Sequence, residues 1–397
     1  MLLEQKIRDA LSARATHEGA TEQAWEAIQR RIDRRASGKR AVQGIAVVSL
    51  FAVAVVGVAG IGQRSRERTL QLAPAPPTAV TSETVAAPPP ALDVPLPQGE
   101  PRALVAAAGS VWAVVADHDG SGSGTLVRID QTTGETAATV AIDAVPGWEV
   151  GGDGIATSPG AIWLAGQTTD ASKGPTALLQ RVDTATNSVS VTLQLPGTSA
   201  ADVIVVDGIV WVSLFVEDGK VGVVALDVDS RSVLATIPVA GSWIRELAYS
   251  DGVIIVHSRD ARRYITAIDE QTRSPVKTVV APMDALSADG SGKRGPVWVV
   301  HGGRLGLLDT QTLKVRLDDS IEVASSTIVH PLDSNLLFLA ASDEAAPRGK
   351  LHLYNGEETI AQSTPDGEVI AITAAAGRAW VLLYDGRLAG VPIGAKP

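Results

Sequence analysis

A landmark that recurs at nearly constant spacing constrains the fold of this chain more than any other sequence feature. An apolar residue, usually tryptophan, stands three positions after a glycine or an asparagine. The seven pairs are Gly109/Trp112, Gly160/Trp163, Gly208/Trp211, Gly252/Ile255, Gly295/Trp298, Asn335/Phe338 and Gly377/Trp380. The intervals between the apolar members are 51, 48, 44, 43, 40 and 42 residues, which is the spacing of β-propeller blades.

A second landmark, an aspartate-centred turn, follows each of the first five pairs. The aspartates are Asp130, Asp183, Asp227, Asp269 and Asp309, and the sixth repeat has a shorter turn around Tyr354. Glycine and asparagine supply the positive φ of a tight hairpin, and an aspartate side chain accepts backbone N–H groups within its own turn. A large apolar tryptophan suits packing between sheets. These landmarks therefore predict structure, not chemistry.

Seven repeats of four short strands over residues 91–397 predict an all-β, seven-bladed β-propeller. The last repeat ends at Pro397 without a fourth strand. Residues 92–96 (LDVPL) resemble the fourth strands of other repeats, such as LQLPG at 193–197. We therefore expect residues 91–97 to pair with the C-terminal strand and close the ring, which removes two open sheet edges.

The repeat also resembles a known group. Residues 109–134 (GSVWAVVADHDGSGSGTLVRIDQTTG) are similar to the blade motif of virginiamycin B lyase-like and YVTN-type propellers, in which a Gly-x-x-Trp strand leads to an Asp-x-x-Thr-Gly turn. The resemblance covers residues 91–397 and implies the propeller fold. It does not imply the lyase activity, because the tryptophans are followed by Ala113, Leu164, Val212, Val299 and Val381 and no His/Glu set can be transferred.

A different kind of segment precedes the repeats. Residues 41–62 contain no charge, and these 22 residues rise about 33 Å as a helix, enough to cross a bilayer. Six Lys and Arg residues at 30–40 precede this predicted transmembrane helix, and three arginines at 64–68 follow it. The excess of positive charge before this helix predicts a single-pass cell-membrane protein with a cytoplasmic N-terminus and an extracytoplasmic propeller. Residues 1–40 are expected to be a short helical segment, and residues 63–90 a proline-rich stalk.

Charge and cysteine content exclude several classes of function. Outside residues 1–40 and 63–68 the chain has 22 Lys and Arg against 37 Asp and Glu, so nucleic acid is not an expected partner. Cysteine is absent, which excludes disulfides, thiolate metal sites and a cysteine nucleophile. Arginine outnumbers lysine 25 to 9, a bias common in bacteria with GC-rich genomes.

Candidate functional residues lie in the loops that join second to third strands and one repeat to the next, because these loops share one face of a propeller. From them we single out Trp148, Trp243, Arg245, Glu246, Glu217, His257 and His301 as ligand- or partner-binding residues. The two tryptophans are the best candidates for contact with a partner. We predict no catalytic residue, no metal ligand and no cofactor.

Three functions are compatible with the sequence. The first is a membrane-anchored module that binds an extracytoplasmic protein, peptide or glycan, with residues 1–36 available to a cytoplasmic protein. The second is a tethered propeller enzyme of the lyase or lactonase type that depends on a divalent cation, and the third is a structural envelope protein. The sequence favours the binding module.

Overall fold

The computed structural model describes residues 91–397 except 119–121, 148–153, 171–173, 282, 288–295, 324–326, 332–336, 344–345, 355–358, 363–366 and 394–397. These residues belong to the second of two compact units of the chain, Val85–Pro397. Among them, no helix is long and apolar enough to cross a membrane. The predicted segments 1–40, 41–62 and 63–90 lie outside the described residues, so they stay predictions.

Six of the sheets each contain four consecutive antiparallel strands. The first three contain β2 (Glu100–Ala107), β3 (Ser110–Ala116), β4 (Gly124–Asp130) and β5 (Thr136–Ile142); β6 (Ile155–Ser158), β7 (Ala161–Asp170), β8 (Gly174–Asp183) and β9 (Ser188–Gln194); and β10 (Ser199–Val206), β11 (Ile209–Phe215), β12 (Val221–Asp227) and β13 (Val233–Pro238). A short 3-10 helix, η1 (Glu217–Gly219), joins β11 to β12.

The next three sheets follow the same order. They contain β14 (Trp243–Ser250), β15 (Val253–Arg259), β16 (Arg263–Asp269) and β17 (Ser274–Val280); β18 (Ala285–Ser287), β19 (Val297–His301), β20 (Arg304–Asp309) and β21 (Lys314–Glu322); and β22 (Thr327–Pro331), β23 (Leu337–Asp343), β24 (Ala346–Tyr354) and β25 (Thr359–Gln362).

A seventh sheet combines the two ends of the described chain. β1 (Leu92–Pro95) pairs antiparallel with β28 (Arg387–Pro392), which continues into β27 (Arg378–Leu383) and β26 (Val369–Ala375). Leu92 lies opposite Gly390, and Pro95 lies opposite Arg387. Residues 92–95, within the predicted closing segment 91–97, thus pair with the last described strand.

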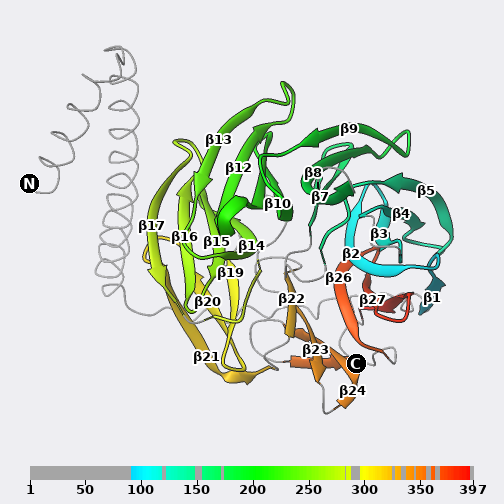
Figure 1. Cartoon of the computed structure of the whole chain (residues 1–397). Helices are drawn as coiled ribbons and strands as arrows, with labels where there is room; N and C mark the ends of the chain where they lie inside the picture. Colours follow the sequence, from blue (N-terminus) through cyan, green and yellow to red (C-terminus); the bar gives the residue numbers. More distant parts are fainter. Residues whose placement is uncertain are drawn as a thin grey trace, which may run out of the picture. The chain divides into compact units, whose positions relative to one another are not determined.

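The sheets are arranged in a ring. The first strand of each sheet contacts the first strand of the next, in the order β2, β6, β10, β14, β18, β22, β26 and back to β2. In Figure 1, β10, β14, β22 and β26 lie toward the centre, whereas β5, β9, β13, β17 and β21 lie at the periphery. The predicted all-β propeller architecture is confirmed.

The repeated tryptophans hold neighbouring sheets together. Trp112, Trp211 and Trp380 are fully buried, and Trp163 is 2% exposed. Trp112 packs in one apolar cluster with Ile162 and Leu178 of the following sheet. Trp380 likewise packs with residues of β3 and β4, across the point where the ring closes. The expected structural role of the tryptophans follows from this packing.

The aspartate turns also have the predicted geometry. Each of the five aspartates accepts the backbone N–H groups of the second and third residues after it, at 2.7 to 3.1 Å. The fourth residue after each aspartate has positive φ: Gly134, Asn187, Arg231, Arg273 and Leu313. Only the first two of these residue types favour that conformation.

This mismatch yields a prediction about stability. Arg231 is exposed and has a φ of 57°, which costs a side chain with a Cβ about 1 kcal/mol. We expect Arg231→Gly to raise the free energy of unfolding by up to about 1 kcal/mol, measured by urea denaturation. Arg231→Ala removes the same side chain but keeps the Cβ, so it serves as the control. Equal stability of the two variants would show that the backbone conformation does not carry this cost.

The two faces of the ring differ in their connections. We call the face with the second-to-third strand loops and the sheet-to-sheet loops the loop face, and the opposite face the turn face. The N–H of Leu96, just after β1, donates to the carbonyl of Gly386 in the β27–β28 loop at 3.0 Å. Since β1 therefore ends at the loop face, residue 91 enters the ring from the turn face.

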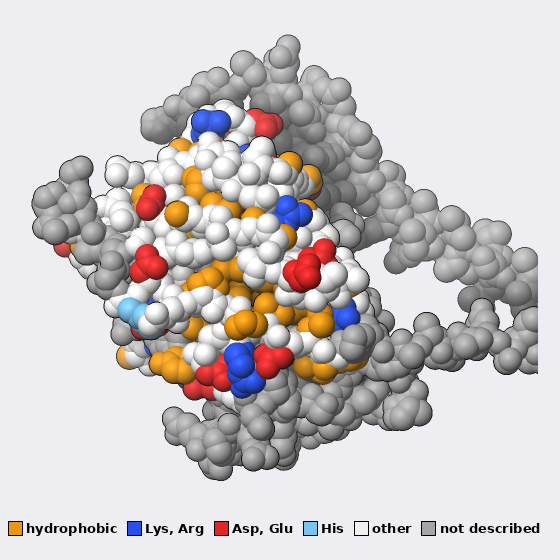
Figure 2. All heavy atoms as spheres, turned by 90° about the vertical axis from the view of Figure 1, so that its right-hand side faces the viewer, with side chains coloured by type: hydrophobic (Ala, Val, Ile, Leu, Met, Phe, Trp, Pro, Cys, Tyr) orange, Lys and Arg blue, Asp and Glu red, His pale blue; other side chains and the backbone are white. Residues whose placement is uncertain are grey.

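On one side of the ring, charged residues are scattered over the surface (Figure 2). Figure 2 views the side where β1 and β5 lie in Figure 1. Among the described atoms on that side, acidic and basic groups are scattered between hydrophobic and neutral ones, and they do not gather by sign. Around β14 to β18, polar side chains of two neighbouring sheets contact one another and form the candidate site.

Candidate functional site

An aromatic cluster marks the loop-face end of the β14–β17 sheet. Trp243 is the first residue of β14 and lies opposite Arg259, the last residue of β15. Its ring meets that of Phe215 on β11 at 5.1 Å and 71°, and the Arg259 guanidinium carbon lies 5.7 Å from its centroid. Trp243 and Phe215 are half-buried and Arg259 is exposed. The cluster thus joins two sheets and presents an aromatic ring and a cation at the surface.

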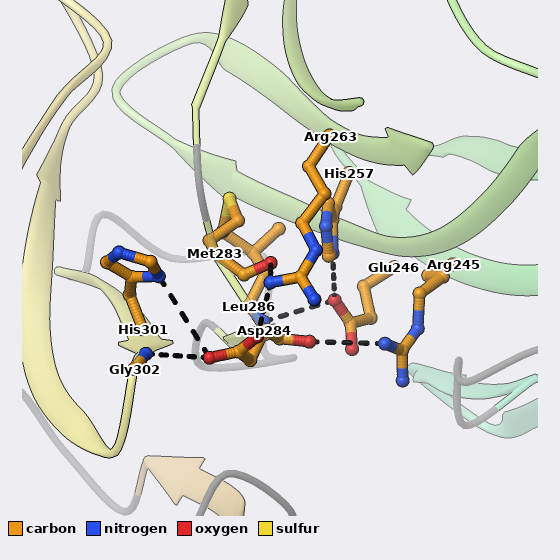
Figure 3. A network of polar contacts seen from close by, with 9 residues as sticks. All are labelled: Arg245, Glu246, His257, Arg263, Met283, Asp284, Leu286, His301 and Gly302. Atoms are coloured by element: carbon orange, nitrogen blue, oxygen red, sulfur yellow. Dashed lines mark hydrogen bonds and ion pairs between the residues drawn. The ribbon is translucent and has the colours of Figure 1, made fainter. Parts of the chain in front are cut away.

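A β-bulge places an arginine beside this cluster. The pairing of β14 with β15 shifts between Ile244 and Glu246, so Arg245 is the extra residue. Its guanidinium Nη1 donates to the carbonyl of Asp284 at 3.2 Å, in the loop between β17 and β18. The side chain of Arg263, the first residue of β16, donates to the carbonyl of Met283 at 2.8 Å. Two arginines of one sheet therefore converge on the start of the next (Figure 3).

The Asp284 carboxylate is held by three groups. It forms an ion pair with Arg263, accepts the N–H of Gly302 at 2.7 Å and lies 4.0 Å from His301 Nδ1. Partial burial acts to raise the pKa of Asp284, but the Gly302 N–H and the Arg263 charge outweigh it, so this pKa lies below its usual range. Asp284 is therefore a carboxylate at neutral pH.

A buried Glu–His pair lies beneath these surface groups. His257 is 1% exposed and Glu246 is 9% exposed, and the two face each other across β14 and β15. The Glu246 carboxylate lies 2.7 Å from His257 Nδ1 and accepts the N–H of Leu286 on β18 at 3.1 Å. His257 Nε2 is buried and has no hydrogen-bond partner among the residues that the structure describes. Figure 3 shows Glu246 between His257 and Leu286.

The repeat itself shows that this pair is unusual. His257 stands two residues after the landmark position Ile255. At the same position, five other sheets have apolar residues: Val114, Ala165, Val300, Ala340 and Leu382. The residues paired opposite four of these are also apolar: Ala103, Ala285, Ile328 and Ala371. The propeller architecture therefore does not require a Glu–His pair.

The preceding sheet supplies a structural explanation for half of the pair. There the equivalent residues are Asp202 and Ser213, and the Ser213 hydroxyl accepts the Asp202 N–H at 2.9 Å. Asp202 also accepts the N–H of Leu247, on the first strand of the following sheet, at 2.7 Å. Glu246 makes the same kind of link to Leu286. Both buried carboxylates thus join the first strands of neighbouring sheets, a role that explains Glu246 but not His257.

The depressed pKa of Asp284 leads to a prediction about acid stability. A carboxylate with a lowered folded-state pKa stabilises the fold above its unfolded pKa, near 3.9, and this contribution is lost as pH falls through the folded value. We expect Asp284→Asn to cost about 1 kcal/mol of unfolding free energy at pH 7, after allowance for solvent screening. The difference from the unmodified protein should shrink between pH 5 and pH 3, measured by thermal unfolding.

A matched control separates this effect from a general change in charge. Asp229→Asn removes one negative charge from an exposed turn residue on the opposite face. The thermal stability of the Asp229→Asn variant should equal that of the unmodified protein from pH 7 to pH 3. A constant difference between the Asp284→Asn variant and the unmodified protein from pH 7 to pH 3 would contradict the prediction.

The structure brings five of the seven sequence-predicted residues to one place. Trp243, Arg245, Glu246, His257 and His301 lie at or just below the loop-face end of the β14–β17 sheet and its contact with β19. Glu217 lies in η1 of the preceding sheet, and its side chain is not described. Trp148 lies outside the described residues.

The expectation that all of these residues lie in loops is wrong. Glu246 lies within β14 and His257 within β15, where both are buried, and Trp243, Arg245 and His301 also belong to strands. The physical reason is that the strands extend further toward the loop face than the turn signals indicate. The β-bulge at Arg245 then directs neighbouring side chains both to the surface and to the interior.

Sequence reasoning missed several residues of the site. Arg259, Arg263, Asp284 and Phe215 were not singled out. A signal for two of them exists, because residues 258–264 (SRDARRY) hold three arginines in a strongly acidic part of the chain. No local pattern indicates that Asp284 or Phe215 approaches them. Among the described residues, no group of three His, Asp or Glu could hold a metal ion.

Comparisons with known proteins identify the fold alone. No protein-family description matches the chain, and no curated protein matches it. A chain from the crystal structure of a mitotic checkpoint complex is similar at 12% identity and a TM-score of 0.56, over 83% of this chain and 99% of that one. The computationally designed Ika8 protein is similar at 14% identity and a TM-score of 0.53, over 76% of this chain and 99% of that one.

Proposed function

We propose that this chain is a membrane-anchored, extracytoplasmic β-propeller that binds a protein through its loop face. The observation that carries the binding role is the half-exposed Trp243–Phe215 pair with Arg259 over the tryptophan ring. Tryptophan and arginine are enriched among the residues that dominate binding energy at protein interfaces. β-Propellers commonly serve as platforms for other proteins, which agrees with this role.

The path of the chain supports the choice of face. Residue 91 enters the ring from the turn face, because β1 ends beside the β27–β28 loop on the loop face. A tether that precedes residue 91 would therefore attach at the turn face. The loop face, with Trp243, would be left accessible to a partner.

Site-specific photo-crosslinking tests the binding face. A photoreactive amino acid replaces Lys220, which is exposed on the loop face, or Asp229, which is exposed on the turn face. We expect protein adducts in intact cells from position 220 and not from position 229. Equal yields at the two positions, or adducts only from position 229, would contradict the proposed binding face.

The absence of cysteine permits a direct test of topology. Asp229→Cys places a single thiol in the propeller, and Ser12→Cys places one in the N-terminal segment. A membrane-impermeant maleimide should label the first variant in intact cells, and the second only after lysis. The chain should also stay in the membrane pellet after carbonate extraction. Labelling of neither variant before lysis would refute the extracytoplasmic location.

A further inference from the structure

Positive charge is concentrated at the loop-face end of the β14–β17 sheet. Residues 91–397 contain 22 Lys and Arg against 36 Asp and Glu. Four of those 22 cations lie on the neighbouring strands β14, β15 and β16 and in the loop between β15 and β16: Arg245, Arg259, Arg262 and Arg263. We call these four residues the arginine patch. Its charge is opposite in sign to the net charge of residues 91–397, where acidic residues predominate.

The described carboxylates beside the arginine patch, Asp260, Asp284 and Glu246, already have partners within the protein. Asp260 accepts the N–H of Arg262 at 2.7 Å and the hydroxyl of Tyr264 at 3.1 Å. Asp284 pairs with Arg263, and Glu246 is buried against His257. Within the described part of the chain, the Arg245 side chain donates only to a neutral carbonyl, and Arg259 lies over an aromatic ring. Among the described side chains, Arg245, Arg259 and Arg262 therefore form no ion pair with a carboxylate.

A comparison within the ring shows that this arrangement is not a by-product of the repeat. β2 has the same kind of bulge, between Pro101 and Ala103, and Arg102 is its extra residue. There the arginine forms an ion pair with Glu100 of its own strand. In β14 the residue at the place of Glu100, two before Arg245, is Trp243. Among the described side chains, Arg245 forms no ion pair with an acidic residue of its own strand, and its guanidinium donates to the Asp284 carbonyl instead.

We propose that the arginine patch and Trp243 bind an acidic segment, rich in Asp and Glu, of a protein partner. This inference rests on the proposed protein-binding function and names the chemistry of the partner. Arginine guanidinium groups match carboxylates in a planar, two-point geometry. Trp243 and Phe215 offer apolar surface beside the cations to an aliphatic or aromatic side chain of the same segment. Arg259 already covers one face of the Trp243 ring, which disfavours stacking of a sugar ring there.

Binding of defined peptides to the full chain, purified in a non-ionic detergent, tests the proposal. The probe is a synthetic peptide of alternating Asp and Glu residues around one Leu, and the matched control peptide has Asn and Gln in their place. We expect the acidic peptide to bind at least about tenfold more tightly than the neutral one, by biolayer interferometry. The difference should diminish as salt rises from low to high concentration, because exposed charges are screened.

Variants of the protein locate the binding. Arg262→Ala and Arg259→Ala should each weaken the binding of the acidic peptide by about tenfold. Arg231→Gln, which removes an exposed arginine from the turn face, should leave the binding unchanged. Arg262 is the safer variant, because its exposed side chain does not hold a neighbouring sheet. Equal binding of the two peptides, or equal effects of all three substitutions, would overturn the proposal. Tighter binding of a sulfated dextran than of the acidic peptide would overturn it in favour of an anionic glycan.

Crosslinking in cells separates this inference from the proposed function. If adducts form from position 220 and persist in the Arg259→Ala/Arg262→Ala double variant, the loop face binds a protein but not through the arginine patch. If the adducts disappear in the double variant, and the acidic peptide binds the unmodified protein, both proposals stand. If no adduct forms from position 220 while the peptide still binds, the recognition of acidic segments stands and the proposed cellular partner does not.

Discussion

Glu246→Ala is expected to cost about 3 kcal/mol of unfolding free energy, because it removes one member of a buried polar pair. The substitution leaves two buried donors without a partner: the N–H of Leu286 and, in the tautomer that donates to Glu246, His257 Nδ1. The side chain of His257 is 1% exposed, so water does not replace the lost contact. Urea denaturation of the variant and the unmodified protein measures the difference.

The propeller supplies its own control for this prediction. The first sheet has Ala103 and Val114 at the equivalent positions, and the fifth has Ala285 and Val300. The double variant Glu246→Ala/His257→Val therefore reproduces a pair that the same architecture accommodates twice. We expect it to recover more than half of the stability lost in Glu246→Ala, since a buried polar pair is often replaceable by apolar residues. A double variant no more stable than Glu246→Ala would show that the pair has a role that apolar packing cannot replace.

Val94→Asp is expected to prevent stable closure of the ring, at a cost of about 4 kcal/mol or more. Val94 is 6% exposed and packs with Trp380 and Leu388 in the cluster that joins the composite sheet to the first. A carboxylate at this position loses its hydration without gaining a partner. Release of β1 would also expose the edge of β28 and promote aggregation.

The neighbouring residue provides the matched control for Val94→Asp. Asp93 lies on the same strand with its side chain exposed, 3.7 Å from Arg387. Asp93→Ser changes charge but not the core, so it should alter the unfolding free energy by less than about 0.5 kcal/mol. Limited proteolysis near residues 91–97 reports opening of the strand directly. If the Val94→Asp variant resists proteolysis near residues 91–97 as well as the unmodified protein does, the predicted role of β1 is contradicted.

The elements predicted correctly are those specified by local physical chemistry. A two-residue turn such as Asp207-Gly208 requires positive φ at both positions, and the aspartate turns satisfy their own backbone N–H groups. Tryptophans at a fixed distance from the turns must then lie between sheets. Because the sequence near each end of residues 91–397 supplies complementary parts of one sheet, the closing pair of β1 and β28 was also predictable.

The candidate site illustrates what local patterns do not determine. The sequence indicated Trp243, Arg245, Glu246, His257 and His301 as members of one face, from their places in the repeat. It did not indicate that Glu246 and His257 are buried while Arg245, the residue before Glu246, is only half-buried. That difference depends on a one-residue bulge, which reverses the direction of every side chain beyond it.

The sequence by itself determined the repeat, its turns, the residues that pack between sheets and the strand that closes the ring, since each of these follows from residue types that recur at fixed places in the repeat. Only the tertiary structure decided which polar groups meet across sheets. Asp284 reaches Arg245 and Arg263 from a loop about 20 to 40 residues away, and Phe215 reaches Trp243 from another sheet. Such contacts depend on the angle and offset between neighbouring sheets, which are set by the packing of the whole ring and leave no periodic trace in the chain.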